Sequence, residues 1–232
     1  DVGTLSVIAR IFDKRRGMMS GVVKVGTAIG QIIIPLTVTH MILVADWRSV
    51  ALGLGITAIV LLICAAQGMG LKVKTPTPIA PGSPGATWAG LTLAEAARTR
   101  AFWILCIAQL AFMPTLVTIP LHLPAHALDM GADPAWGGEL LATIAGASIA
   151  GRLMVGRTAD WWGGRPALLL SLIALAVSLF VLPSLDAPWM LFGFAICYGF
   201  GHGGLFTVVS PVTAEYFGMR AHGAIFGMII FC

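Results

Sequence analysis

Charged side chains are scarce in this sequence. Asp, Glu, Lys and Arg make up only 10% of the 232 residues, whereas soluble domains carry about 25%. Hydrophobic residues reach 58%, and the mean hydropathy is +0.92. So little charge does not suit an ordinary soluble surface, and the composition therefore indicates a membrane protein.

Motifs for catalysis and metal binding are also missing. The four cysteines, Cys64, Cys106, Cys197 and Cys232, lie in apolar runs without CxxC or Cys/His spacing, so we expect buried free thiols. The sequence has no HExxH, no Walker glycine loop and no Ser/His/Asp grouping with supporting context. We therefore expect no metal, no cofactor and no enzymatic activity.

Long apolar runs dominate what is present. A helix needs about 20 apolar residues to cross a bilayer. Six complete spans are expected, at residues 25–45, 49–71, 101–128, 140–156, 166–185 and 187–214. Shorter apolar runs at 2–9 and 221–232, an initial Asp and the absence of a signal-peptide pattern predict a piece of a longer chain.

The charges that exist are distributed unevenly between the span ends. Alternate ends carry the basic residues Arg10, Lys14, Arg15, Arg16, Lys72, Lys74, Arg98, Arg100, Arg157, Arg165 and Arg220. The opposite ends carry Arg48 together with Asp1, Asp46, Asp129, Asp133, Glu139 and Asp186. This positive-inside asymmetry places the basic ends in the cytoplasm, and it explains the net charge of +4 without nucleic acid as a partner.

A proline-rich segment divides the chain. Four prolines and two glycines between Thr75 and Ala86 leave no apolar face, which is typical of a linker. Thr92 and Glu95 then have the spacing of a helix capping box. We predict three parts: 1–71 as the remainder of an N-terminal half, 72–100 as a cytoplasmic linker, and 101–232 as a truncated C-terminal half.

Two distant segments echo each other. "ARIFDKRRGMMSGVV" and "AEYFGMRAHGAIFGMI" both run Ala, any residue, apolar, Phe, a basic turn, and two glycines four residues apart. Six span positions separate them, and a parallel repeat of six helices is one architecture of secondary transporters.

The chain resembles the major facilitator superfamily, and within it the oxalate/formate and monocarboxylate transporter branch. "GRTADWWGGRP" is similar to the loop pattern of the superfamily, and "FDKRRGMMSG", "GTAIGQIIIP" and "DWR" are similar to its fourth-to-sixth helix region. The resemblance implies an all-α membrane protein with a partial major facilitator fold, from the end of helix four to the start of helix eleven of twelve.

The resemblance also assigns a cytoplasmic gating loop. From Gly156 onward we expect a turn, with Gly156, Arg157, Asp160, Gly163 and Arg165 as its functional residues. Trp161 replaces the cation expected after Asp160, which weakens a latch through that carboxylate. Gln31 stands where the antiporter signature has Pro, so exchange transport does not follow from that signature.

Two cations lie deep inside predicted spans. Lys24 is eight residues after Arg16 and Arg152 is eight before Asp160, or about 12 Å from the cytoplasmic helix ends at 1.5 Å per residue. A charge at that depth costs at least about 2.5 kcal/mol and marks a cavity or a partner. No Asp or Glu lies well inside a complete span, so an anionic substrate would complement them, with the Arg152 fork on a carboxylate. Alternatively, Lys24 snorkels, or either cation pairs with an acid outside this sequence.

Further lining residues follow from helix periodicity. Ser20, Lys24, Thr27 and Gln31 share one face, while Gly26 and Gly30 lie on another where a neighbouring helix could approach. His202, with Tyr198 one turn before it, is a candidate to contact substrate or change protonation, or else a packing histidine. Gln109 shares a helix face with Phe112. His122, His126 and most tryptophans suit the membrane interface.

These residues predict a secondary active transporter for a mono- or dicarboxylate, working by alternating access as a symporter or an antiporter. Its partners are a small organic anion, the lipid bilayer and, as a candidate coupling ion, the proton. The alternative is a transporter of a neutral or drug-like solute, with Lys24 and Arg152 in structural ion pairs; a channel or receptor of the same fold is also open. We expect a multi-pass protein of the bacterial inner membrane, with substrate-binding residues Arg152, Lys24, His202, Tyr198, Gln31, Thr27 and Gln109.

Overall fold

A computed structural model describes residues 4, 5, 8, 12, 15–42, 44–69 and 90–231 of the chain. The described residues separate into two units, one built from 1–29 with 87–232 and the other from 30–86. The boundary at residue 30 falls inside a helix, and the division of the chain into two halves with a linker stays a prediction. Residues 72–89 of the predicted linker lie outside the described residues.

The predicted spans are confirmed as helices. The first is α2 (Arg16–Ile42), followed by α3 (Trp47–Met69), α5 (Arg100–Asp129), α6 (Trp136–Trp162), α7 (Gly164–Val181) with the short η1 (Leu182–Ser184), and α8 (Met190–Phe217). Helix α2 begins nine residues before the predicted span, because Lys24 and Arg16 are accommodated within the helix. The described residues thus contain six helices long and apolar enough to cross a membrane.

The unit of residues 30–86 contains the second part of α2 and the whole of α3. Helix α3 is apolar along its length, yet only 6% of its most apolar 18-residue stretch is buried. Cys64 on α3 is exposed, so the prediction of a buried thiol is wrong there; Cys106 is buried and Cys197 is half-buried. An apolar helix with so little packing has the surface expected of a lipid-facing span.

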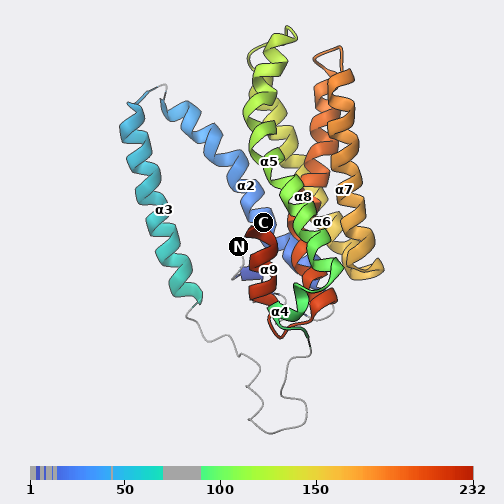
Figure 1. The fold of residues 1–232 in the computed structure, drawn as a ribbon. Coiled ribbons are helices and arrows are strands. Elements are labelled where there is room, and N and C mark those ends of the chain that lie inside the picture. The colour runs from blue at the N-terminus through green and yellow to red at the C-terminus, as the bar shows by residue number, and fades with distance from the viewer. Residues whose placement is uncertain are drawn as a thin grey trace. The chain divides into compact units, whose positions relative to one another are not determined.

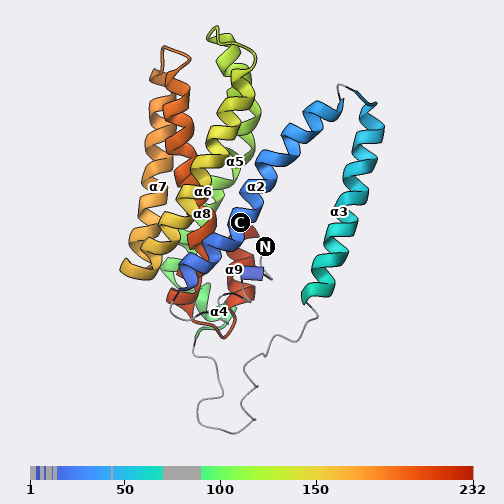
Figure 2. The same cartoon turned by 180° about the vertical axis from the view of Figure 1, so that it is seen from behind.

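In the larger unit, α5 to α8 form an antiparallel bundle, joined by α9 (His222–Phe231) and the first part of α2. The connections from α5 to α6 and from α7 to α8 lie at one end of this bundle, and those from α6 to α7 and from α8 to α9 lie at the other (Figures 1 and 2). Helix α8 contacts α6, α7, α5 and α9, and 67% of its most apolar 18-residue stretch is buried. It is therefore the central helix of this unit.

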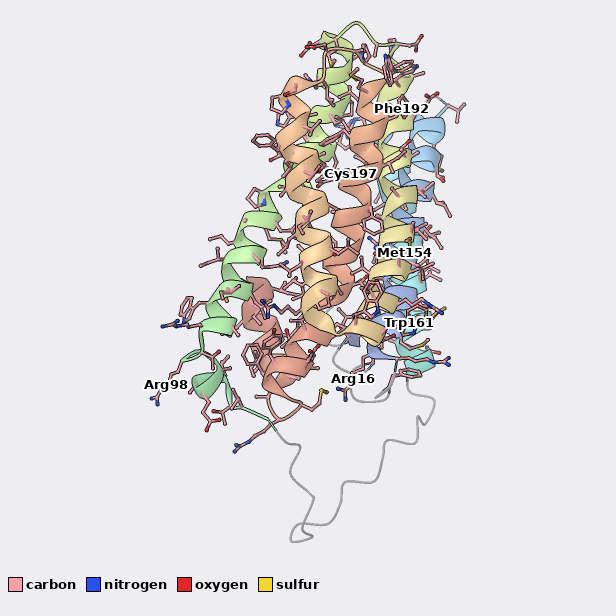
Figure 3. The ribbon with its side chains drawn as sticks, turned by 90° about the vertical axis from the view of Figure 1, so that its right-hand side faces the viewer. Arg16, Arg98, Met154, Trp161, Phe192 and Cys197 are labelled. Carbon is pink, nitrogen blue, oxygen red and sulfur yellow. The ribbon has the colours of Figure 1, made fainter. Side chains whose placement is uncertain are left out.

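The two ends of the bundle differ in charge as the sequence predicts. We call one the basic end because helix termini there carry Arg98, Arg100, Arg157, Arg165 and Arg220. Figure 3 shows Arg16, Arg98 and Trp161 at this end, whereas Phe192 lies near the opposite end. The positive-inside rule predicts that the basic end faces the cytoplasm.

A short helix, α4 (Leu93–Ala96), lies at the basic end before α5 begins. The predicted capping box is confirmed: Thr92 Oγ1 accepts from the Glu95 backbone N–H, and the Glu95 carboxylate accepts from the Thr92 N–H at 2.7 Å. These hydrogen bonds with Thr92 lower the pKa of the Glu95 carboxyl below its usual range. The Leu91 N–H also donates to the Phe217 carbonyl at 2.8 Å, which ties this segment to the end of α8.

Candidate functional site

Arg152 is the most deeply buried charged residue in the described chain. It lies in the middle of α6, and only 1% of its surface is exposed. Its Nη1 donates to the carbonyl oxygen of Lys24 and, at 2.9 Å, to Thr27 Oγ1. Its Nε is buried and has no hydrogen-bond partner among the described residues. One edge of the guanidinium is therefore held by α2, and a buried donor remains on another.

Lys24 brings a second cation to the same place from α2. Its side chain is 4% exposed, and its Nζ lies 5.0 Å from the centroid of the Phe206 ring on α8. Arg152 Cζ lies 6.0 Å from the same centroid. Cations within about 6 Å of an aromatic face are attracted by its quadrupole, but two like charges on one ring repel each other. An anion between them would relieve that repulsion.

Sequence reasoning missed Phe206. An aromatic residue in an apolar span does not stand out by composition, yet Phe206 lies one turn after His202, which lies one turn after Tyr198. This four-residue spacing places the three rings along one face of α8. Extending the stripe from Tyr198 and His202 by one turn would have identified it.

His202 lies within a group of aromatic rings. Its ring is 5.1 Å from Phe206, 5.7 Å from Tyr198 and 5.7 Å from Phe112 on α5, measured between centroids. The side chain is 5% exposed, and its Nδ1 has no hydrogen-bond partner among the described residues. The site therefore combines an aromatic wall with a buried imidazole nitrogen that no described residue satisfies.

The remaining lining candidates are placed differently. The Tyr198 hydroxyl donates to the Thr115 carbonyl at 2.8 Å, so this ring also ties α8 to α5. Gln109 is buried in α5. Thr27 is exposed, and its Oγ1 both accepts from Arg152 and donates to the Lys24 carbonyl at 2.7 Å. Gln31 is exposed and belongs to the unit of residues 30–86.

Helices α2 and α6 approach closely through glycines other than those predicted. A Cβ on Gly21 would lie 2.5 Å from the Arg152 carbonyl oxygen, and one on Gly156 would lie 2.6 Å from the Gly17 oxygen. A Cβ on Gly26 would meet nothing within 4 Å among the described residues, so the approach of a neighbouring helix there stays a prediction. Gly26 is exposed, whereas Gly17 and Gly21 lie on the face of α2 toward α6.

At the basic end, Asp160 joins α6 to the start of α2. Its Oδ1 accepts from the Gly17 N–H at 2.7 Å and its Oδ2 from the Met18 N–H at 2.9 Å. The first N–H groups of a helix lack intrahelical partners and carry partial positive charge, so a carboxylate there is stabilising. Trp161 does not prevent this contact: its ring lies 3.9 Å from Arg157 Cζ instead.

The expected turn after Gly156 is wrong in extent. Helix α6 continues through Trp162, and only Gly163, with φ 91°, leaves the helical conformation before α7 begins. Residues 157–162 contain neither glycine nor proline, so nothing in them ends the helix before Gly163. Arg157 and Arg165 are exposed, and the Glu215 carboxylate from α8 accepts from the Gly164 N–H at 2.7 Å.

Carboxylates are absent from the buried set in the described ranges. The buried polar residues are Ser20, Lys24, Gln109, Ser148, Arg152, Ser171, Ser178, His202, Thr207, Ser210, Thr213 and His222. The described residues also contain no group of three His, Cys, Asp or Glu side chains that could hold a metal. The described site thus brings buried nitrogen donors together beside aromatic rings, a combination that suits an anion.

Known proteins match the chain over most of its length. The family model of the Major Facilitator Superfamily matches residues 1–232. Monocarboxylate transporter 13 of Rattus norvegicus is 28% identical over 93% of this chain and 49% of its own length. MFS-type transporter 1 of an Ophiocordyceps species is 26% identical over 97% of this chain and 48% of its own. Monocarboxylate transporter 10 of Danio rerio is 25% identical over 97% and 46%. The chain thus spans about half the length of the curated relatives it matches.

Proposed function

Because the chain belongs to the major facilitator superfamily, we propose that the full-length protein is a secondary active transporter that moves a small organic anion by alternating access. The relatives named as transporters indicate a transporter rather than an enzyme. The six apolar helices make it a multi-pass integral membrane protein. The expected fold class, an all-α membrane protein of this superfamily, is confirmed. The relatives come from a mammal, a fungus and a fish, so the bacterial inner membrane stays a prediction.

The observation that carries the substrate class is the buried guanidinium of Arg152. Its Nη1 is directed to the Lys24 carbonyl and Thr27, while its buried Nε has no partner among the described residues. A buried donor without a partner costs free energy, about 1–3 kcal/mol, and more for a charged group. A substrate carboxylate accepting from the free edge of Arg152 would remove that cost.

The second cation and the rings refine the substrate. Lys24 adds a point charge near the same Phe206 ring, so a second carboxylate or a single shared one suits it. Phe112, His202 and Phe206 offer an apolar wall beside the cations. A mono- or dicarboxylate with a short apolar body matches both features, and two relatives are named as monocarboxylate transporters.

Alternating access gives the contacts of α2 a role. Arg152 and Asp160 both join α6, in the C-terminal half, to α2, in the N-terminal half, as the superfamily resemblance assigns them. Contacts made by side chains across that boundary can break and re-form when the halves rock. We assign Asp160 to the cytoplasmic gate, with Gly156, Arg157, Gly163 and Arg165 around it. Protons remain a candidate coupling ion, with His202 as the candidate group.

Uptake of labelled monocarboxylates and dicarboxylates into vesicles that contain the full-length protein tests this function. We expect saturable uptake of chemically unchanged substrate, and Arg152→Gln should lower it on the order of 100-fold because a charged partner of the carboxylate is lost. Arg98→Gln removes an exposed cation at the basic end and is the matched control. Wild-type uptake by Arg152→Gln would contradict the anion site. Competition only by neutral solutes would instead favour a neutral or drug-like substrate, with structural ion pairs at Arg152 and Lys24.

A further inference from the structure

A cavity lies at the basic end, away from the buried cations. It has a volume of about 260 Å³ and is lined by Arg15, Met18, Arg157, Asp160 and Trp161. Arg15 belongs to the segment before α2, and the other side of the cavity is the last two turns of α6. Two arginines from separate elements thus face one hollow at the membrane-interface end of the bundle.

The charge of this cavity favours an anion although Asp160 lines it. Both Asp160 oxygens already accept from the Gly17 and Met18 N–H groups, so the carboxylate is directed at the start of α2. Arg15 and Arg157 are both exposed. Arg157 Cζ lies over the Trp161 ring, 3.9 Å from its centroid, and a guanidinium placed over a ring can still donate from its N–H groups. Guanidinium groups in such positions suit a phosphate.

The surface next to the cavity is apolar on the side toward the middle of the membrane. Met154, Arg157 and Trp161 follow one another at helical spacing on α6, and Met154 and Trp161 are 58% and 65% exposed. In Figure 3, Met154 lies farther from the basic end than Trp161 on the same helix. On α2, Met18 is followed one turn later by Val22, which is 47% exposed. Cations and a tryptophan at the interface, with apolar side chains deeper, match the headgroup and acyl chain of a phospholipid.

We propose that this cavity binds the phosphate of an anionic phospholipid, such as phosphatidylglycerol, between Arg15 and Arg157, with Trp161 beside the glycerol backbone. The bound headgroup bridges Arg15, just before α2, and the end of α6, next to the contact that Asp160 makes with the first residues of α2. An anionic lipid therefore stabilises the contact between α2 and α6 at the basic end. This site is independent of the substrate site at Arg152.

Native mass spectrometry of the full-length protein in detergent tests the proposal, with phosphatidylglycerol, phosphatidylcholine and inorganic phosphate as probes. The wild type should retain phosphatidylglycerol in preference to phosphatidylcholine. The double variant Arg15→Gln/Arg157→Gln should bind phosphatidylglycerol roughly 30-fold more weakly, since each basic residue near an anionic surface contributes about a factor of five. The matched control Arg98→Gln/Arg220→Gln makes the same change in net charge at exposed positions of the same end and should keep the affinity.

Trp161→Ala keeps both cations and tests the site even if the double variant does not fold. It should weaken phosphatidylglycerol binding several-fold without changing the melting temperature of the lipid-free protein. Equal affinity in the wild type and the Arg15/Arg157 variant would overturn the proposal, as would an equal loss in the control. Displacement of the lipid by inorganic phosphate at similar concentration would show a free-phosphate site and contradict the lipid assignment. Unchanged binding by Trp161→Ala would also count against it.

Discussion

Helix α6 packs against α8 on one face and against the first part of α2 on another, and the two contacts are built differently. Toward α8, the backbone of Ser148 lies against Gly203, and Gly151 lies against the carbonyl of Phe200. Toward α2, glycines again allow close approach, but Arg152 and Asp160 add side-chain hydrogen bonds to Lys24, Thr27, Gly17 and Met18.

The difference separates packing from function. Small residues let two helices approach closely and hold them by van der Waals contact, which suits a permanent interface. Buried charged groups are costly in a membrane and are retained where they bind ligands or change partners. The α6–α8 contact is therefore expected to stay intact during transport, and the α2–α6 contact to rearrange.

The largest effect is expected at the packing face. Gly203→Ala places a methyl group against the Ser148 backbone, which cannot move without shifting α6, so the folded protein should be destabilised by roughly 1–3 kcal/mol or more. At Gly193 on the same helix, an added Cβ would have no neighbouring atom within 4 Å. Gly193→Ala is therefore the matched control and is expected to be neutral or stabilising. Thermal unfolding measures both. Similar melting temperatures for the two variants would refute the packing role of Gly203.

At the α2 face, the form of the cation should decide transport. Arg152→Lys keeps the charge but loses the planar fork that contacts the Lys24 carbonyl and Thr27 and that we propose also binds the substrate carboxylate. We expect carboxylate uptake to fall roughly 10- to 100-fold, the value of one strong charged hydrogen bond, with little change in melting temperature. Arg98→Lys serves as the control. Uptake that is insensitive to Arg152→Lys would mean that charge alone, and no directed contact, is used.

Two carboxylates sharpen the comparison because each binds the N-terminus of a different helix. Asp160→Asn should weaken the α2–α6 contact, so a cysteine placed at the buried Ser20 should react with maleimide roughly tenfold faster. Glu215→Gln loses a similar contact with Gly164, but between α8 and α7 inside the bundle. It should lower thermal stability and leave the Ser20→Cys labelling rate unchanged. Equal labelling in both variants would remove the distinction between the two interfaces.

The smallest effect is expected at Thr27. Thr27→Val keeps the shape but removes the oxygen that accepts from Arg152 Nη1, so the guanidinium is positioned less well. The KM for carboxylate uptake should rise about fivefold, the value of one ordinary hydrogen bond. Thr37→Val on the same helix loses only a bond to the Ile33 carbonyl and should keep the wild-type KM. An unchanged KM in Thr27→Val would exclude a positioning role.

Several features were predictable from the sequence because they depend on local pattern. Apolar runs of sufficient length gave the spans, and the spacing of Thr92 and Glu95 gave the capping box. Lys24 and Arg152 stood out because a charge inside an apolar run costs free energy in a membrane, and its position can be read from the sequence. Each of these signals lies within one segment of the chain.

Contacts between distant segments were not predictable in the same way. Asp160 and Gly17 are 143 residues apart, and no local pattern relates a carboxylate to the N–H of another helix. Phe206 looks like any core aromatic until Lys24 and Arg152 are found over its ring. Gly26 and Gly21 have similar sequence surroundings, and only the position of α6 determines that Gly21 is the contact.

Equilibrium binding of a short carboxylate and of its neutral amide tests the central claim most directly. Propionate and propionamide have similar shapes, and their affinities for the purified full-length protein can be compared by calorimetry. We predict that the wild type binds the acid and not the amide, and that Arg152→Gln loses this preference while keeping its melting temperature. Equal binding of acid and amide by the wild type, or an undiminished preference for the acid in Arg152→Gln, would contradict the assignment of Arg152 as the residue that holds the substrate.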